Sequence, residues 1–336
     1  MTGFSFTERY GDSTRAVKAV DCEALGGHPV APVPTPASAF HLSAEEGSES
    51  HVYGRYSNPG WDRLESALAQ LEAAPAALVF GSGMAAVAVA LRVALKPGSV
   101  LVVPLDGYYQ VRRYARESLA PLGITVREAT AAQLYDAAET ADVVLAETPT
   151  NPRLDVVDLR RLADICHQRS GLLFVDNTAA TPLGQQPLSL GADLVVASAT
   201  KALAGHSDLL AGYAAGGRPD LMAALERERL LAGPVLGAFE TWMLLRSIGS
   251  FGLRFERQCR NAMALAIELA DADAVHALVR HSDLLVAATS FGGIHTSIDR
   301  RARWGDDVPS GFARISAGIE DTDDVVADIR QALDAD

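Results

Sequence analysis

The segment Asp193-Leu194-Val195-Val196-Ala197-Ser198-Ala199-Thr200-Lys201 passes from an apolar run directly into two hydroxyl side chains and a lysine. A short apolar run bounded by polar residues predicts a buried strand over 193–197. A second apolar run, 172–175, ends in Asp176-Asn177-Thr178. The carboxyl ends of neighbouring parallel strands meet at the sheet edge where α/β folds bind ligands. We therefore expect Lys201 and Asp176 to serve the same site.

Apolar runs and amphipathic segments alternate on both sides of this segment. The stretch 61–73, for example, has apolar residues at helical spacing. Such alternation predicts an α/β fold with a parallel sheet that helices cover on both faces. The expected strands are 77–80, 100–104, 142–147, 172–176, 193–197 and 211–215, and the expected helices are 61–73, 83–95, 110–120, 156–169 and a short piece at 186–190.

The two ends of the chain follow other patterns. Residues 1–50 contain closely spaced prolines, which favour extended chain, and are predicted to be irregular. Residues 220–271 are predicted to be mostly helical, with Arg254 inside a long helix that runs to about residue 270. A smaller α/β lobe that ends in a helix at 321–334 is predicted to follow. The expected domains are an arm over 1–55, a large domain over 56–220, and a long connecting helix with a small domain over 221–336.

Composition disfavours several kinds of protein. The 336 residues suffice for two domains, and 29 basic against 42 acidic residues disfavour nucleic acid or an anionic membrane as partner. Cys22, Cys166 and Cys259 are far apart, so we expect no disulfide framework, no metal site and a reducing cytoplasm. Neither a secretory signal nor an apolar run long enough to span a membrane is visible.

The chemistry of Lys201 and Asp176 points to a pyridoxal-phosphate site. An amine can form a Schiff base with this cofactor, an acid can hold its pyridinium nitrogen, and small hydroxyls can bind its phosphate. Desolvation and nearby positive charge would favour the neutral amine that a Schiff base needs. The alternatives are a surface role for Lys201 and a turn-capping role for Asp176, but lysines rarely end a buried strand without a partner.

Gly81-Ser82-Gly83-Met84 follows the strand at 77–80 and opens the helix at 83–95. A glycine turn that leads into a helix N-terminus presents free N–H groups to an anion, which suits a phosphate. The alternative is a turn of small residues that allows close packing. A dinucleotide fingerprint is not completed, because Ala86 stands where its third glycine would be.

Other candidate residues lie just past expected strands. Tyr108, beside Tyr109, would stack on a cofactor ring or simply pack. Asn151, in a turn that Glu147 precedes, would bond a phenolic oxygen or hold a proline-bounded turn. Arg314 would bind a substrate carboxylate or form a structural ion pair. His206 and Asp208 are interpreted as holding the loop after Lys201 rather than as metal ligands or a catalytic dyad.

In this order, these motifs resemble the Cys/Met-metabolism family of fold-type I pyridoxal-phosphate enzymes. The resemblance covers nearly the whole chain, and the block at 198–208 is highly specific. It implies a large domain with a mostly parallel seven-stranded sheet and a smaller C-terminal α/β domain. The matching motifs are TRAVKA (14–19), YGRYSNP (53–59), GSGMAA (81–86), DGYYQ (106–110), ETPTNP (147–152), VDNTAATP (175–182), PLSLGADLVVASATKALAGHSD (187–208), SFGG (290–293) and RISAGIEDTDD (314–324).

The resemblance implies a role for each residue of the cofactor site. Lys201 would be the Schiff-base lysine, and Asp176 would be the partner of the pyridine nitrogen. Tyr108 would stack on the ring, and Asn151 would contact the ring hydroxyl. The residues that would hold the phosphate are Gly83, Met84, Ser198 and Thr200.

Two further pairs have implied roles. Arg314, with Ser290, would take the substrate α-carboxylate. Tyr53 and Arg55 resemble residues that reach the phosphate of a neighbouring subunit, which implies an obligate dimer, usually arranged as a homotetramer.

The chain departs from the family pattern at three places. Only residues 271–285 stand where relatives have a longer segment that completes the small-domain sheet, so this domain is predicted to be shortened. His295 stands where cystathionine-handling members often have a glutamate. Gln110 stands where the methionine γ-lyase type has a cysteine.

The motifs at 288–309 are most similar to bacterial cystathionine γ-lyases. The expected activity is therefore γ-elimination on L-cystathionine or a close sulfur amino acid, giving cysteine, 2-oxobutyrate and ammonia. Lys201 would take the Cα proton, and Tyr108 would assist the departing sulfur. The alternatives are cystathionine γ-synthase chemistry on an activated homoserine, methionine γ-lyase activity, and an impaired paralogue with a truncated small domain.

Overall fold

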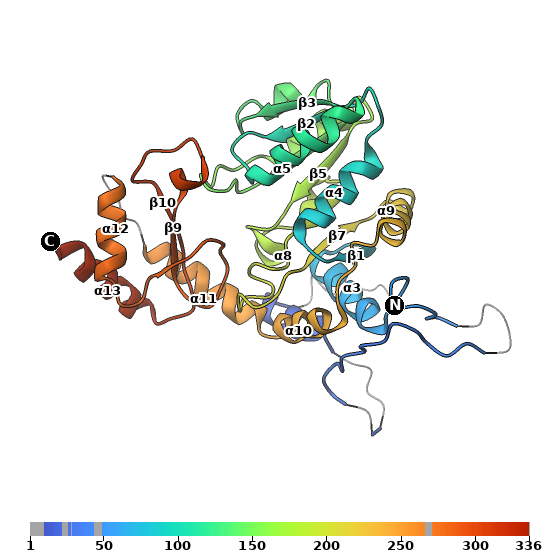
Figure 1. Cartoon of the computed structure of the whole chain (residues 1–336), viewed down its shortest axis with the longest axis horizontal. Coiled ribbons are helices and arrows are strands. Elements are labelled where there is room, and N and C mark those ends of the chain that lie inside the picture. The colour runs from blue at the N-terminus through green and yellow to red at the C-terminus, as the bar shows by residue number, and fades with distance from the viewer. Residues whose placement is uncertain (1–9, 22–25, 28, 44–48, 266–270, 336) are drawn as a thin grey trace. The chain divides into compact units, whose positions relative to one another are not determined.

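The chain forms two compact units (Figure 1). The larger unit contains the chain up to Thr200 together with Leu209–Ser250. The smaller unit contains Lys201–Asp208 together with the chain from Phe251 onward. The domain boundaries expected after residues 55 and 220 stay a prediction. The computed structural model describes residues 10–21, 26–27, 29–43, 49–265 and 271–335.

A seven-stranded sheet forms the centre of the larger unit (Figure 1). Its strands are β1 (Ala76–Phe80), β2 (Val100–Pro104), β3 (Thr125–Ala129), β4 (Val143–Glu147), β5 (Leu172–Asp176), β6 (Leu194–Ala197) and β7 (Gly212–Gly216). Their order is β1-β7-β6-β5-β4-β2-β3. The pairs from β3 through β6 are parallel, whereas β7 is antiparallel to both neighbours. The mostly parallel sheet is thus confirmed, with β5 and β6 adjacent as expected.

The sequence pattern does not predict strand β3. Thr125 and Arg127 are exposed and only Ala129 is buried, so this segment contains no apolar run. It lies at the edge of the sheet, where polar residues are common.

Helices flank the sheet of the larger unit. They are α2 (Asp12–Ala19), α3 (Pro59–Glu72), α4 (Gly83–Ala94), α5 (Tyr109–Tyr114), α6 (Leu134–Ala138), α7 (Leu159–His167), α8 (Thr181–Gly184), α9 (Pro219–Ala232) and α10 (Ala238–Ile248). A π-helical turn at Ala115–Leu119 continues α5, and short 3-10 turns lie at Ala120–Leu122 and Pro187–Leu190.

Successive residues of a strand point to opposite faces of the sheet, and helices bury both faces. On one face, Leu145 and Phe174 belong to an apolar core that includes residues of α4, α5 and α9. On the other face, Ala146 and Val175 belong to a second core, built with α6 and α7. The strands therefore read as continuous apolar runs, which is why their positions could be predicted.

Helix α2 corrects the prediction that the first 50 residues are irregular. Ala16 and Ala19 are buried on one side of this helix. Arg15, also buried, donates from Nη2 to the Leu71 carbonyl at 2.9 Å. The prolines that favour extended chain begin only after this helix, at Pro29.

The prediction that residues 220–271 are mostly helical is confirmed where the structure describes them. The region contains α9, α10 and α11 (Phe251–Ala264) as separate helices. Gly233 adopts a left-handed conformation (φ 75°) directly after α9 and is followed by Pro234, which cannot continue a helix. Arg254 lies in α11, and the predicted end of the helix near residue 270 lies outside the described residues.

The smaller unit has its own sheet of three strands, β8 (Val286–Ala287), β9 (Ser297–Arg300) and β10 (Ala313–Ser316), in the order β10-β9-β8. Besides α11, this unit contains α12 (Ala272–His281), a 3-10 turn at Arg301–Trp304 and α13 (Thr322–Asp334). Ile298 packs with Leu278 of α12 and Ile329 of α13 in a separate apolar core. The smaller C-terminal α/β lobe, ending in a helix, is confirmed.

Within the described ranges, no helix is both long enough and apolar enough to cross a membrane.

Candidate active site

The start of α4 lies against the end of β6 in the larger unit. A Cβ atom at Gly83 would lie 2.7 Å from Cβ of Ser198, so only glycine fits at this approach. Ser82 caps the helix, because its Oγ accepts from the Ala85 N–H at 3.1 Å. The N–H groups of Gly83 and Met84 have no hydrogen-bond acceptor among the described residues. They therefore form, with Ser198, a cradle open to an anion.

Hydrogen bonds connect this cradle to Asp176. The Ser198 N–H donates to Thr178 Oγ1 at 2.8 Å, and the Thr178 N–H donates to Asp176 Oδ1 at 3.0 Å. The Thr200 hydroxyl exchanges hydrogen bonds with the backbone of Ala211, at 3.0 and 3.2 Å. The larger unit thus joins helix N–H groups, hydroxyls and a carboxylate, which fit a phosphate and a protonated ring nitrogen. Sequence reasoning missed Thr178, whose hydroxyl makes the link.

Glu147 joins the loops that carry Tyr108 and Asn151. Its Oε2 accepts from the Tyr108 N–H at 2.7 Å, and its Oε1 accepts from the Asn151 N–H at 2.8 Å. Burial, and then the charge of Asp176 directly across the strand pair, raise the pKa of the Glu147 carboxyl well above its usual value. The Tyr108 ring packs edge-on against Tyr109, with ring centres 5.3 Å apart. A side chain that bonds only backbone N–H groups leaves no sequence signal, so this role of Glu147 was not predicted.

In the smaller unit, Lys201, Ser290 and Arg314 form one hydrogen-bonded group. Lys201 Nζ donates to Ser290 Oγ at 2.8 Å, and Arg314 Nη2 donates to the Ser290 carbonyl at 2.6 Å. Ser290 has φ 86°, which is strained for a residue with a side chain and is typical of functional sites. The Phe291 ring centre lies 5.2 Å from both Lys201 Nζ and Arg314 Cζ. The sequence motif SFGG therefore holds the two predicted site residues Lys201 and Arg314 together.

Arg314 is mostly buried beside other charged groups. Burial and then the nearby charge of Arg301 lower its pKa to about 10, whereas the charges of Asp299, 3.7 Å away, and Asp306 raise it. Its forked guanidinium has the geometry that binds a carboxylate.

Arg254 holds the backbone that follows Lys201. Its Nη1 donates to the Ala202 carbonyl at 2.7 Å, and its Nη2 donates to the Leu203 carbonyl at 3.0 Å. Burial lowers the pKa of Arg254 to about 10. Gly292 (φ 77°) approaches the same backbone, and a Cβ there would lie 2.5 Å from the Ala202 nitrogen. The sequence placed Arg254 in a helix but gave no sign of this role.

The remaining candidate residues lie outside the groups described above. Arg55 donates from Nη1 to the Leu230 carbonyl at 2.5 Å, and it lies over the rings of Tyr53 and Tyr56, with Cζ 5.6 and 4.8 Å from their centres. Tyr53 is exposed. His206 Nδ1 lies 2.7 Å from the Ala204 carbonyl oxygen, which agrees with a role in holding its own loop. His295 is exposed.

Comparison with known proteins gives consistent matches. The family described as Cys/Met metabolism PLP-dependent enzyme matches residues 14–286. A Streptomyces coelicolor protein, named by inference as a cystathionine gamma-lyase, is 42% identical over 370 positions, covering 96% of this chain and 94% of its own. The L-methionine gamma-lyase of Pseudomonas putida is 31% identical, covering 97% of this chain and 98% of its own.

A solved structure also matches closely. Cystathionine gamma synthase from Xanthomonas oryzae pv. oryzae, in complex with aminoacrylate and cysteine, has a TM-score of 0.89 and 26% identity. The match covers 97% of this chain and 98% of the synthase chain. The alignment with the Streptomyces protein is longer than the 336 residues of this chain, so that relative contains residues that are missing here.

Proposed function

The chain belongs to the Cys/Met-metabolism family of pyridoxal-phosphate-dependent enzymes, and from this premise we propose that it cleaves L-cystathionine, or a close sulfur amino acid, by γ-elimination. The reaction would consume a water molecule and release cysteine, 2-oxobutyrate and ammonia. The observation that carries the proposal is the hydrogen-bonded group of Lys201, Ser290 and Arg314. This group joins an amine, a hydroxyl and a guanidinium within one unit, which supports a site that binds and deprotonates an amino acid.

The cofactor would be held mainly by the larger unit. When bound, pyridoxal phosphate withdraws electrons from the α-carbon of the amino acid and so weakens its C–H bond. We assign the pyridine nitrogen to Asp176, the ring face to Tyr108 and the ring hydroxyl to Asn151. The groups assigned to the phosphate are Gly83, Met84, Ser198 and Thr200.

The protein groups would divide the work of binding and proton transfer. Arg314, with Ser290, would bind the α-carboxylate through its forked guanidinium. Lys201 Nζ, directed by its hydrogen bond to Ser290 Oγ, would take the proton from the α-carbon. The Tyr108 hydroxyl would donate a proton to the departing sulfur. Arg254 would keep Lys201 in place by holding the next two carbonyl groups.

Two observations support the γ-lyase over the methionine-specific enzyme. The chain is more similar to the Streptomyces protein named for cystathionine than to the Pseudomonas enzyme named for methionine. Gln110 takes the place of the cysteine of the methionine type, and its Nε2 donates to the Tyr109 hydroxyl at 2.9 Å. The second candidate is γ-replacement on an activated homoserine, which the structural match with the Xanthomonas synthase favours.

A comparison of three substrates tests the proposal. The purified protein, loaded with pyridoxal phosphate, is given L-cystathionine, L-methionine, or O-acetyl-L-homoserine with L-cysteine, and 2-oxobutyrate, thiols and cystathionine are quantified. We expect the highest kcat/KM for L-cystathionine. The Lys201→Ala variant should turn over none of the three substrates. Formation of cystathionine as the main product would instead support the synthase. No turnover of any substrate by the loaded protein would support an impaired paralogue.

We also propose an obligate dimer, arranged as a homotetramer in the cytoplasm, in which Tyr53 and Arg55 reach the cofactor of the neighbouring subunit. Exposure of Tyr53, beside the Arg55 guanidinium, supports this role. Mixing Lys201→Ala with Arg55→Ala protomers tests it, because mixed dimers would regain one intact site. We expect partial recovery of activity on mixing and a tetramer by light scattering. An active monomer would contradict the proposal.

A further inference from the structure

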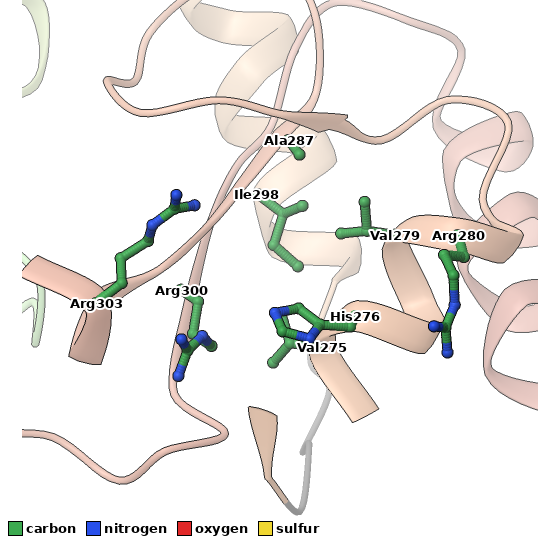
Figure 2. Close-up of a pocket in the computed structure, with 8 residues that line it drawn as sticks. All are labelled: Val275, His276, Val279, Arg280, Ala287, Ile298, Arg300 and Arg303. Atoms are coloured by element: carbon green, nitrogen blue, oxygen red, sulfur yellow. The ribbon is translucent and has the colours of Figure 1, made fainter. Parts of the chain in front are cut away.

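The smaller unit contains a pocket of about 550 Å³ between α12 and β9, which we call the α12–β9 pocket. This volume lies within the usual range for small-molecule sites, about 300–1,000 Å³. Figure 2 shows apolar side chains in its middle, with Arg303 and Arg280 on opposite sides in this view. The lining residues are Val275, His276, Val279, Arg280, Ala287, Ile298, Arg300 and Arg303.

The pocket lies on the face of the small sheet opposite to Arg314. Residues directly across an antiparallel pair share a face, and Arg314 is paired with Asp299. Ile298 and Arg300 flank Asp299 on β9 and therefore point to the other face. The pocket is thus separate from the group formed by Lys201, Ser290 and Arg314.

The charges in the pocket are all of one sign. Among the described residues, Arg280, Arg300 and Arg303 form no ion pair with a carboxylate, and no acidic residue lines the pocket. Asp299, next to Arg300 in the chain, is bonded to Arg301 at 2.9 Å on the opposite face. Arg300 is half-buried, whereas Arg280, Arg303 and His276 are exposed. One partly buried guanidinium beside an apolar wall suits one negative charge attached to an apolar body.

We propose that the α12–β9 pocket binds a monocarboxylate with an apolar body, such as a medium-chain fatty acid. The carboxylate lies on Arg300, and the hydrocarbon chain lies on Val279, Ala287 and Ile298. The exposed arginines attract the anion to the entrance. A neutral molecule of the same shape should bind more weakly, because it has no negative charge for Arg300. A small carboxylate should also bind more weakly, because it makes no apolar contact.

Calorimetric titration of the holoenzyme with octanoate tests this site without requiring turnover. We expect saturable binding of one octanoate per chain, at least about tenfold tighter than octanamide or acetate. Arg300→Leu should weaken octanoate binding at least about tenfold, because it removes the charge and keeps the apolar volume. Arg330→Leu, on the exposed side of α13, is the matched control and should bind as the parent does.

Two more variants decide where octanoate binds. Val279→Trp fills the pocket and should abolish binding even if Arg300→Leu fails to fold, as a thermal melt would show. Arg314→Leu removes the proposed substrate guanidinium and should leave octanoate binding unchanged. The proposal would be overturned if octanoate and octanamide bound equally well. It would also be overturned if folded Arg300→Leu or Val279→Trp bound octanoate as the parent does, or if Arg314→Leu lost octanoate binding.

Discussion

The two units position their site groups by different means. In the larger unit the backbone does most of this work: strands end beside each other, α4 begins at Gly83, and Glu147 accepts two backbone N–H groups. In the smaller unit, long side chains hold loop carbonyl groups, as Arg254 holds Ala202 and Leu203. The geometry of the larger unit thus depends on a buried sheet, whereas the loops of the smaller unit depend on single arginine side chains. We therefore expect single substitutions to damage the smaller unit more.

Replacing Arg254 should give the largest effect. Arg254→Met keeps the length of the side chain but leaves two carbonyl groups without donors, and should lower the free energy of unfolding by about 4 kcal/mol. The control is Arg257→Met in the same helix, whose bond to Asp321 is exposed and should cost less than about 1 kcal/mol. Urea unfolding followed by far-ultraviolet circular dichroism measures both. Equal losses in the two variants would show that Arg254 has no special role.

In the larger unit, Glu72 should make stability depend on pH. Its carboxyl is fully buried and accepts from Tyr213 and Asn177, and burial raises its pKa to about 7. Between pH 4.5, its ordinary pKa, and pH 7, only the unfolded state loses this proton. The free energy of unfolding should therefore fall by about 3 kcal/mol as the pH rises through this range.

Glu72→Gln removes this titration, so the slope of stability against pH should flatten between these pH values. Glu117→Gln, an exposed residue, should keep the parent slope. Urea unfolding at several pH values is the measurement. An unchanged slope in Glu72→Gln would mean that Glu72 does not retain its proton in the folded chain.

Replacing Glu147 should have a smaller effect, on activity. Both of its oxygens accept an N–H, and glutamine offers only one oxygen, so its NH2 would face the other N–H. We expect Glu147→Gln to lower kcat/KM for the sulfur amino acid by about tenfold through displacement of the Tyr108 or Asn151 loop. Glu139→Gln, a surface change, is the control. Full activity in Glu147→Gln would remove the positioning role given to this carboxylate.

The smallest expected effect is a difference in stability between two glycine-to-alanine variants, which separates a steric clash from backbone strain. Gly292 and Gly98 both have positive φ, but a Cβ would meet the Ala202 nitrogen at 2.5 Å only at Gly292. Gly98→Ala should cost about 1 kcal/mol from strain alone, and Gly292→Ala about 1 kcal/mol more. Thermal melts of both variants compare them. A smaller loss in Gly292→Ala would show that the SFGG segment is free to move.

The same contrast explains what the sequence could predict. Lys201, Asp176 and Gly83 stand at the ends of apolar runs, so their positions follow from burial and periodicity. The role of Glu147 could not be predicted, because it bonds only backbone groups. The role of Arg254 depends on a contact between residues 52 positions apart. The short strands of the smaller unit bury too few residues to give a clear pattern.

The most direct test of the proposed reaction is the visible absorbance of the purified, pyridoxal-phosphate-loaded protein before and after addition of L-cystathionine. We expect a cofactor band that changes on addition, together with release of cysteine and 2-oxobutyrate, and neither change in Lys201→Ala. Absence of both the band and the products in the parent protein, with cofactor in excess, would contradict the proposed γ-elimination.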